Sequence, residues 1–180
     1  MKLQVSQYTA MPYELQIANA MIYQPCGLAI HSIIPEAESR DYNAHTFFIN
    51  NSFVHYRSAK ITPTKAGQFV TLWKRNADGP IQPLSAADAF DLCIIATQHA
   101  NHFGQFIFTK DILSKHGILA STLRDGKRGF RVYLPWDAGL NKQAQKTQQW
   151  QLNHFIDLSA DQQPDLLKAK HLLQTANNIA

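Results

Sequence analysis

The sequence is poor in the features that mark secreted and membrane proteins. It has two cysteines in 180 residues, Cys26 and Cys93, and no Cys-x-x-Cys pair, which argues against a disulfide framework and a zinc knuckle. No stretch reaches the roughly 18 apolar residues of a membrane span, and residues 1–10 carry one lysine and no apolar run. We therefore expect one cytoplasmic domain over residues 1–180, without membrane association, in which Cys93 is a buried free thiol.

Several motifs of well-known chemistries are also missing. There is no Gly-x-x-x-x-Gly-Lys loop, no Gly-x-Gly-x-x-Gly turn and no Gly-x-Ser-x-Gly elbow, so nucleotide cradles and hydrolase nucleophiles of these kinds are not indicated. His99 and His102 form a His-x-x-His pair, but in a polar loop rather than on one helix face. A solvated loop is therefore favoured over a metal site for this pair.

What the chain does have is an apolar, aromatic-rich composition that can fill a core. Hydrophobic residues make up 45% of the sequence, with ten Phe and six Tyr among them. Periodicity, caps and turn residues predict helices over residues 12–23, 110–116, 141–156 and 164–177, and a short helix that a capping box opens at Ser85-Ala86-Ala87-Asp88. They predict strands over residues 28–34, 46–49, 53–61, 68–74, 91–97, 103–108 and 129–134. This order favours an α/β fold in which helices flank a mixed central sheet in three layers, α/β/α.

The positive charge is concentrated in two segments. Residues 55–82 hold five basic and one acidic residue, and residues 124–146 hold six basic and two acidic residues, so each carries +4. The rest of the chain holds six basic and ten acidic residues. If the fold brings the two segments together, their field attracts phosphates, and a nucleic acid becomes the expected partner. The alternative is that both are solvated strand edges, where lysine discourages edge pairing.

Within these segments, cations and tryptophans together are typical of nucleic-acid binding. Lysine and arginine neutralise phosphates, and tryptophan offers a ring on which a base can stack. The first segment supplies the candidates Arg57, Lys60, Lys65, Trp73, Lys74 and Arg75, and the second supplies Lys127, Arg128, Arg131, Trp136, Lys142 and Lys146. A basic hairpin with a core tryptophan, and an ordinary solvated helix face, are the alternatives for the two segments.

An acidic stretch lies just before the first segment. Glu36, Glu38 and Asp41 precede a predicted hairpin that carries Lys60. Carboxylates beside a strand-borne lysine are what a Mg²⁺-dependent phosphodiesterase needs, because the carboxylates hold the metal and the lysine stabilises the developing charge. Three acids in a polar loop are also compatible with a plain solvated loop.

These residues also carry a family resemblance, which runs from about residue 38 to residue 151. The matching motifs include Ala59-Lys60-x-Thr62-Pro63-Thr64-Lys65-x-Gly67-Gln68-Phe69-Val70, Trp73-Lys74-Arg75, Gly79-Pro80-Ile81-Gln82-Pro83, Gly104-Gln105-Phe106-Ile107-Phe108, Lys127-Arg128-Gly129, Pro135-Trp136 and Lys142-Gln143-Ala144-x-Lys146-Thr147-Gln148. In this order they resemble the MepB family of bacterial proteins. The resemblance implies a core similar to that of restriction endonucleases.

The site pattern of that superfamily, Pro-Asp…(Asp/Glu)-x-Lys, is only partly present. It implies Lys60 as the catalytic lysine, on the second strand of the predicted hairpin, with Glu38 and Asp41 as the remaining catalytic and metal-binding acids. Ser58 stands two residues before Lys60, where the pattern has an acid. The sequence therefore favours a nucleic-acid-binding protein that does not cleave, with no cofactor. The alternatives are a Mg²⁺-dependent nuclease using Glu38, Asp41 and Lys60, and a small-anion or protein-binding regulator linked to drug response, with Trp73 and Trp136 in a closed pocket.

Overall fold

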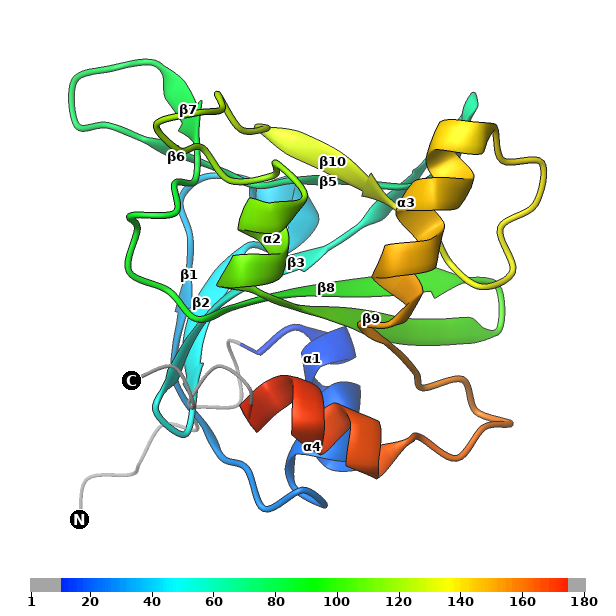
Figure 1. Ribbon diagram of the computed structural model, residues 1–180. Coiled ribbons are helices and arrows are strands. Elements are labelled where there is room, and N and C mark those ends of the chain that lie inside the picture. Colours follow the sequence, from blue (N-terminus) through cyan, green and yellow to red (C-terminus); the bar gives the residue numbers. More distant parts are fainter. Residues whose placement is uncertain (1–10, 175–180) are drawn as a thin grey trace, which may run out of the picture.

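The computed structural model describes residues 11–174 and shows a mixed α/β fold (Figure 1). The strands are β1 Ile30–Pro35, β2 His45–Ile49, β3 Ser52–Ser58, β4 Lys60–Thr62, β5 Lys65–Thr71, β6 Trp73–Arg75, β7 Ile81–Pro83, β8 Leu92–His99, β9 His102–Thr109, β10 Gly129–Val132 and β11 Phe155–Asp157. The helices are α1 Tyr13–Ala18, α2 Lys110–Lys115, α3 Lys142–Leu152 and α4 Leu166–Gln174. A π-helical turn, Asn19–Tyr23, continues α1, and Arg40–Tyr42 form a 3-10 turn.

A six-stranded mixed sheet forms the centre, in the order β1-β2-β3-β8-β9-β11. Only β3 and β8 run parallel; every other neighbouring pair in this sheet is antiparallel. The run from Leu92 to Thr97 in β8 is buried throughout, as expected for a strand covered on both faces. The predicted mixed central sheet is therefore confirmed.

The two faces of the central sheet are covered differently. Leu15 and Ile22 from the N-terminal helical segment and Leu172 from α4 pack on one face. The other face packs against a smaller sheet, β10-β5-β4, through Val70 and Val132, and against α2 and α3 (Figure 1). The second outer layer is thus partly sheet, whereas the sequence predicted helices there.

Four segments depart from the elements predicted by periodicity. Residues 85–88 form a turn that no helix follows. The Asp88 carboxylate accepts from the Ser85 N–H at 2.7 Å, as in a capping box, but Asp88 also pairs with Lys74, and Ser85 forms a bridge with Ala120. The predicted strands at 53–61 and 68–74 each divide, and the second part of the first becomes β4, in a different sheet. Helix α3 stops at Leu152, after which β11 pairs with β9. Tertiary pairing outweighs local periodicity at each of these points.

None of the helices within residues 11–174 is both long and apolar enough to cross a bilayer. Among these residues, Cys93 is a buried free thiol, as predicted, and its burial raises its pKa to about 12. Position 93 lies in β8, at the middle of the central sheet. Such a thiol stays protonated at neutral pH and behaves as a small core residue.

Gly104 is required where β9 meets β11. A Cβ built at this position would overlap the Phe155 ring and would lie 2.7 Å from the Ile156 carbonyl oxygen. We expect Gly104→Ala to lower the free energy of unfolding by about 2 kcal/mol, because β9 and β11 cannot move apart to make room without breaking the backbone hydrogen bonds between them. Gly79, whose Cβ would meet its nearest neighbour at 3.5 Å, is the matched control. Urea unfolding of both alanine variants measures the difference, and equal effects would contradict the close-approach explanation.

Candidate functional site

The small sheet joins the two basic segments of the sequence. Strand β5 comes from the first segment and β10 from the second, and they pair antiparallel. Phe69 in the middle strand lies opposite Lys60 of β4 on one side and Arg131 of β10 on the other. Directly opposed residues project from the same face of a sheet. Lys60 and Arg131 therefore share the face of this sheet that points away from the core residues Val70 and Val132.

Arg131 is held in place by its own strand neighbours. Its guanidinium donates to Thr62 Oγ1 at 2.7 Å and to the carbonyl oxygens of Ala66 and Gly67 at 3.2 Å each. Its centre also lies 5.8 Å from the centroid of the Phe69 ring. These contacts occupy much of its donor capacity, so Arg131 supplies a fixed positive charge rather than a mobile phosphate-binding group.

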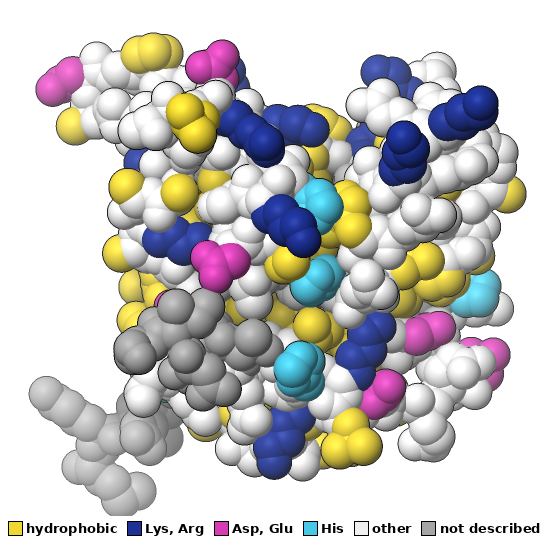
Figure 2. All heavy atoms as spheres, viewed as in Figure 1, with side chains coloured by type: hydrophobic (Ala, Val, Ile, Leu, Met, Phe, Trp, Pro, Cys, Tyr) yellow, Lys and Arg dark blue, Asp and Glu magenta, His cyan; other side chains and the backbone are white. Residues whose placement is uncertain are grey.

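Beside this sheet, a cleft of about 590 Å³ opens between β10, the end of α2 and α3. Lys127, just before β10, and Arg131, on β10, line one side of the cleft, and Lys146, on α3, lines the other. The side chains of Asn141, Gln143 and Thr147 add polar groups. None of the described residues that line the cleft is an aspartate or glutamate. Figure 2 shows Lys and Arg side chains on both sides of a hollow over α2, β10 and α3.

The two lysines of the cleft are available for a ligand. Lys127 and Lys146 are exposed, and among residues 11–174 neither has a carboxylate within 4 Å. Lys142 lies one turn before Lys146 on α3 and is also exposed. Lys65, on the neighbouring strand β5, is exposed as well. The predicted cations that can reach a surface-bound anion are therefore grouped around β10, β5 and α3.

Helix α3 is fastened to β10 by one buried amide. Gln151 is fully buried; its side-chain oxygen accepts from the Tyr133 N–H at 2.8 Å, and its side-chain nitrogen donates to the Arg131 carbonyl at 2.9 Å. The glutamine thus pairs with the outer edge of β10 as a neighbouring strand would. This contact sets the distance between the two walls of the cleft.

An aromatic stack lies in the same cleft. The His116 ring stacks on Trp150 with centroids 3.8 Å apart and planes 6° from parallel. Burial, with Lys115 nearby, lowers the pKa of His116, and burial also lowers the pKa of His154, which contacts Trp150 edge-on at 6.5 Å. Both imidazoles are therefore neutral at pH 7, and the stack presents uncharged aromatic surface to the cleft.

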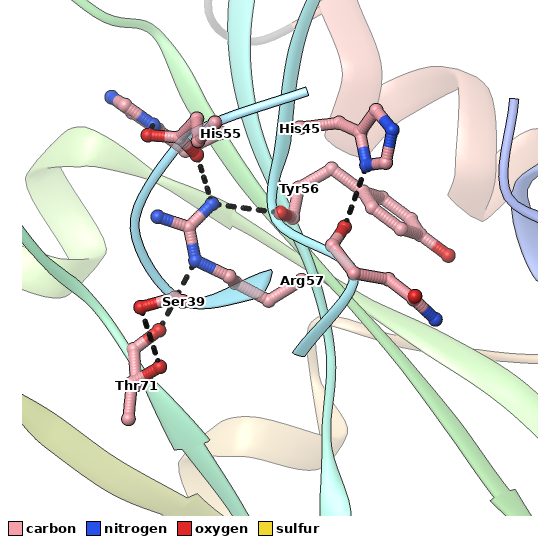
Figure 3. A network of polar contacts seen from close by, with 8 residues as sticks. Ser39, His45, His55, Tyr56, Arg57 and Thr71 are labelled. Carbon is pink, nitrogen blue, oxygen red and sulfur yellow. Dashed lines mark hydrogen bonds and ion pairs between the residues drawn. The ribbon is translucent and has the colours of Figure 1, made fainter. Parts of the chain in front are cut away.

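Arg57, one of the predicted nucleic-acid contacts, is instead a core residue, and this prediction is wrong. Its side chain is completely buried and pairs with Glu36. It also donates to the Tyr56 carbonyl at 2.8 Å and to the Thr71 carbonyl at 3.2 Å (Figure 3). Burial alone would raise the pKa of Glu36, but His55 and Arg57 together hold it below its ordinary value. No surface-bound phosphate can reach this guanidinium.

Strand β6 carries three further predicted contacts, and its cations are already paired. Lys74 forms an ion pair with Asp88, and Arg75 Nε donates to Glu38 Oε1 at 2.9 Å. The Arg75 guanidinium also lies 5.7 Å from the Trp73 ring centroid. The structure does not bring β6 into the lining of the cleft.

Two other predicted contacts are also outside the cleft lining. Arg128 is exposed and donates to the Ile81 carbonyl at 3.2 Å, which ties the start of β10 to β7. Trp136 stacks on His102 with centroids 4.3 Å apart and contacts Phe155 edge-on. The cleft contains Trp150 in place of the two predicted tryptophans, Trp73 and Trp136.

The predicted catalytic residues Lys60 and Glu38 have partners other than each other. Lys60 lies on β4, not on the second hairpin strand as predicted, and its ammonium group is 5.1 Å from the Tyr42 ring centroid. Glu38 is engaged by Arg75, and Asp41 is exposed in the 3-10 turn. Within the described range, no group of three or more potential ligands is arranged for a metal ion, and no ion pair within 4 Å joins Lys60 to Glu38 or Asp41. Metal-dependent cleavage by these residues stays a prediction.

Sequence reasoning missed the neutral residues of the cleft. His116, Trp150 and Gln151 carry no charge and belong to no motif, so a charge count does not find them. One signal was present: Trp150 lies four residues after Lys146 and therefore on the same face of α3. A search of helix faces for cation–aromatic pairs would have identified it.

Comparison with known proteins agrees with the sequence motifs. A family model described as MepB-like matches residues 36–157, a range that contains the small sheet and the whole cleft. A crystal structure described as that of MepB is 35% identical, with a TM-score of 0.70, and the match covers 74% of this chain and 88% of that one. No protein with a curated description matches the sequence. With a matching family model over most of its length and a solved relative of the same fold, this chain belongs to the MepB-like family.

Proposed function

We propose that the protein binds nucleic acid through phosphate contacts in the cleft between β10 and α3. The observation that carries this proposal is the charge of the lining: Lys127, Arg131 and Lys146 lie there with no acidic residue among them. A concave site lined by one sign of charge concentrates counter-ions, because the low-dielectric walls focus the field. Phosphate groups of a nucleic acid are the matching polyanion.

The cations beyond the cleft extend the same surface. Lys142 is exposed on α3, which lines the cleft, and Lys65 and Lys60 are exposed on β5 and β4, the two strands that follow β10 in the small sheet. A backbone with several phosphates in a row can contact these groups in sequence, whereas a single small anion uses only two or three. This spread of charge favours a polymer over the small-anion ligand of the regulator hypothesis.

We further propose that the layered core is the nuclease-like scaffold predicted from the sequence, used for binding. Two features support this proposal. The central sheet has helices on one face and the small sheet with helices on the other, and it contains the parallel pair β3–β8. Ser58 in the acid position of the nuclease pattern and the pairing of Glu38 with Arg75 support binding without cleavage. Cleavage therefore enters the experiment as an outcome to be tested.

The test is a fluorescence-anisotropy titration of labelled oligonucleotides at about 50–300 mM salt, over which counterion release lowers affinity steeply. The double variant Lys127→Ala/Lys146→Ala should bind about tenfold more weakly at low salt, with a salt slope smaller by about two, because two phosphate contacts are lost. Lys170→Ala is the matched control, since this exposed lysine lies on α4, on the opposite face of the central sheet.

Absence of binding at about 50 mM salt would overturn the proposal and favour the regulator hypothesis, since nucleic-acid affinity is highest at low ionic strength. An equal loss in the Lys170→Ala control would place the contact surface elsewhere. The same samples with Mg²⁺ on a gel detect cleavage, and loss of that cleavage in Lys60→Ala would restore the nuclease hypothesis.

A further inference from the structure

We infer that the cleft takes single-stranded nucleic acid, with a phosphate between Lys127 and Lys146 and an unpaired base against the aromatic rings. This inference rests on the proposed function and names its substrate class. Two properties of the cleft, beyond its charge, support the inference: its volume and the stack of aromatic rings already present in it.

The size of the cleft excludes a duplex from its interior. A volume of about 590 Å³ is within the range of sites that enclose a small molecule, roughly 300–1,000 Å³. A double helix can only lie across the mouth of such a site, so it can touch the lysines on the rim but not the rings inside. A single strand can place one nucleotide inside, because its bases are not held in pairs.

The interior of the cleft offers what an unpaired base needs. His116 and Trp150 are already stacked, at 3.8 Å and 6° from parallel, and Tyr133 also lines the cleft. A base that enters adds a further ring to this stack, and base–aromatic stacking tolerates any base because each has a π-face. The amide side chains of Asn141 and Gln143, also in the lining, can form hydrogen bonds to the base edge.

The chain contains a second stack that serves as an internal control. His102 lies on Trp136 with centroids 4.3 Å apart and planes 23° from parallel, outside the lining of the cleft. The two pairs have the same chemistry, histidine on tryptophan. The pair in the cleft shares its lining with Lys127 and Lys146 and should respond to a base.

The experiment compares four probes of equal label in the anisotropy assay: a single strand, its duplex, an abasic strand of the same length, and a nucleoside monophosphate as competitor. We expect the single strand to bind about tenfold more tightly than the duplex and the abasic strand, because stacking of one base on the rings contributes about this factor to the affinity. His116→Leu should remove about the same factor for the single strand only, His116→Phe should restore it, and His102→Leu should behave as wild type. Quenching of tryptophan emission by the strand should disappear in Trp150→Phe.

The outcomes separate this inference from the proposed function. If the duplex or the abasic strand binds as tightly as the single strand, the base does not enter the cleft, and the inference fails while phosphate binding stands. A monophosphate that matches the affinity of the strand makes the ligand a free nucleotide and also overturns it. If none of the four probes binds, the proposed function fails. Circular dichroism of each variant establishes that a loss is not unfolding.

Discussion

Replacing Glu36 with glutamine is expected to lower the free energy of unfolding by about 3 kcal/mol, because the substitution leaves the guanidinium of Arg57 buried without a counter-charge. Arg57 is fully buried, and one of its terminal nitrogens has no hydrogen-bond partner among residues 11–174. Its remaining acceptors, the carbonyl oxygens of Tyr56 and Thr71, carry only partial charges and cannot neutralise the guanidinium. Urea unfolding at pH 7 measures the effect.

Glu38→Gln is the matched control for this substitution. Glu38 pairs with Arg75 at 2.9 Å, but both side chains are partly exposed to solvent, with exposed fractions of 37% and 50%. Exposed pairs contribute about 0–1 kcal/mol, so this variant should be close to wild type. Similar losses in the two variants would mean that the burial of Arg57 does not determine the energy of its pair.

The contribution of Glu36 should also depend on pH in the acid range. Its folded-state pKa is below the ordinary value of 4.5, so its stabilising charge is fully present above pH 4.5 and is lost as the pH falls through the folded-state pKa. The stability difference between wild type and Glu36→Gln should therefore be constant above about pH 5 and should narrow below it. A difference that grows toward acid pH would contradict this assignment.

Replacing Gln151 with leucine is expected to lower the free energy of unfolding by about 2–4 kcal/mol. Leucine can fill the volume, but it leaves the Tyr133 N–H and the Arg131 carbonyl without their partner, and each unmet backbone group costs about 1–3 kcal/mol when buried. The outer edge of β10 would then be free, and α3 would lose its fixed distance from the sheet. Chemical unfolding measures the stability, and hydrogen exchange at the Tyr133 amide measures the loss of protection directly.

Gln149→Leu provides the comparison for this prediction. Gln149 lies two residues earlier on α3 and is exposed, so the same substitution should change stability by about 0.5 kcal/mol or less. If the Gln149 and Gln151 variants lose equal stability, the effect belongs to the helix and not to the contact with β10. An unchanged exchange rate at Tyr133 in Gln151→Leu would contradict the proposed edge pairing.

Much of the fold was predictable because its elements follow simple local rules. The apolar run from Leu92 to Ala96 predicted a strand covered on both faces, and the π-helical continuation of α1 ends at Tyr23, where the helical period predicted it. The predictions failed where a distant partner decided the conformation. Asp88 was taken as a helix-capping residue, but Lys74, on β6, draws it into a turn. Phe155 lies within the helix predicted over residues 141–156, but its pairing with Phe106 of β9 makes it part of a strand.

The candidate site was predictable only for the residues that carry charge and remain exposed. Lys127 and Lys146 were found by counting charges along the sequence, and both line the cleft. The same count also included Arg57, which is buried against Glu36, and therefore overestimated the binding surface. It could not find Gln151, because a neutral residue acts at this site through its position alone.

By itself, the sequence determined the family, the α/β composition and the presence of two basic segments, since each depends on residues close together in the chain. The tertiary structure decided which cations are free. Glu36 neutralises Arg57, Asp88 neutralises Lys74 and Glu38 neutralises Arg75, in each case across 14 to 37 residues of sequence. Among residues 11–174, Lys127 and Lys146 have no ion-pair partner, and they lie on opposite walls of a cleft. The physical reason is that an ion pair depends on distance in space, which the order of residues does not specify until the strands have paired.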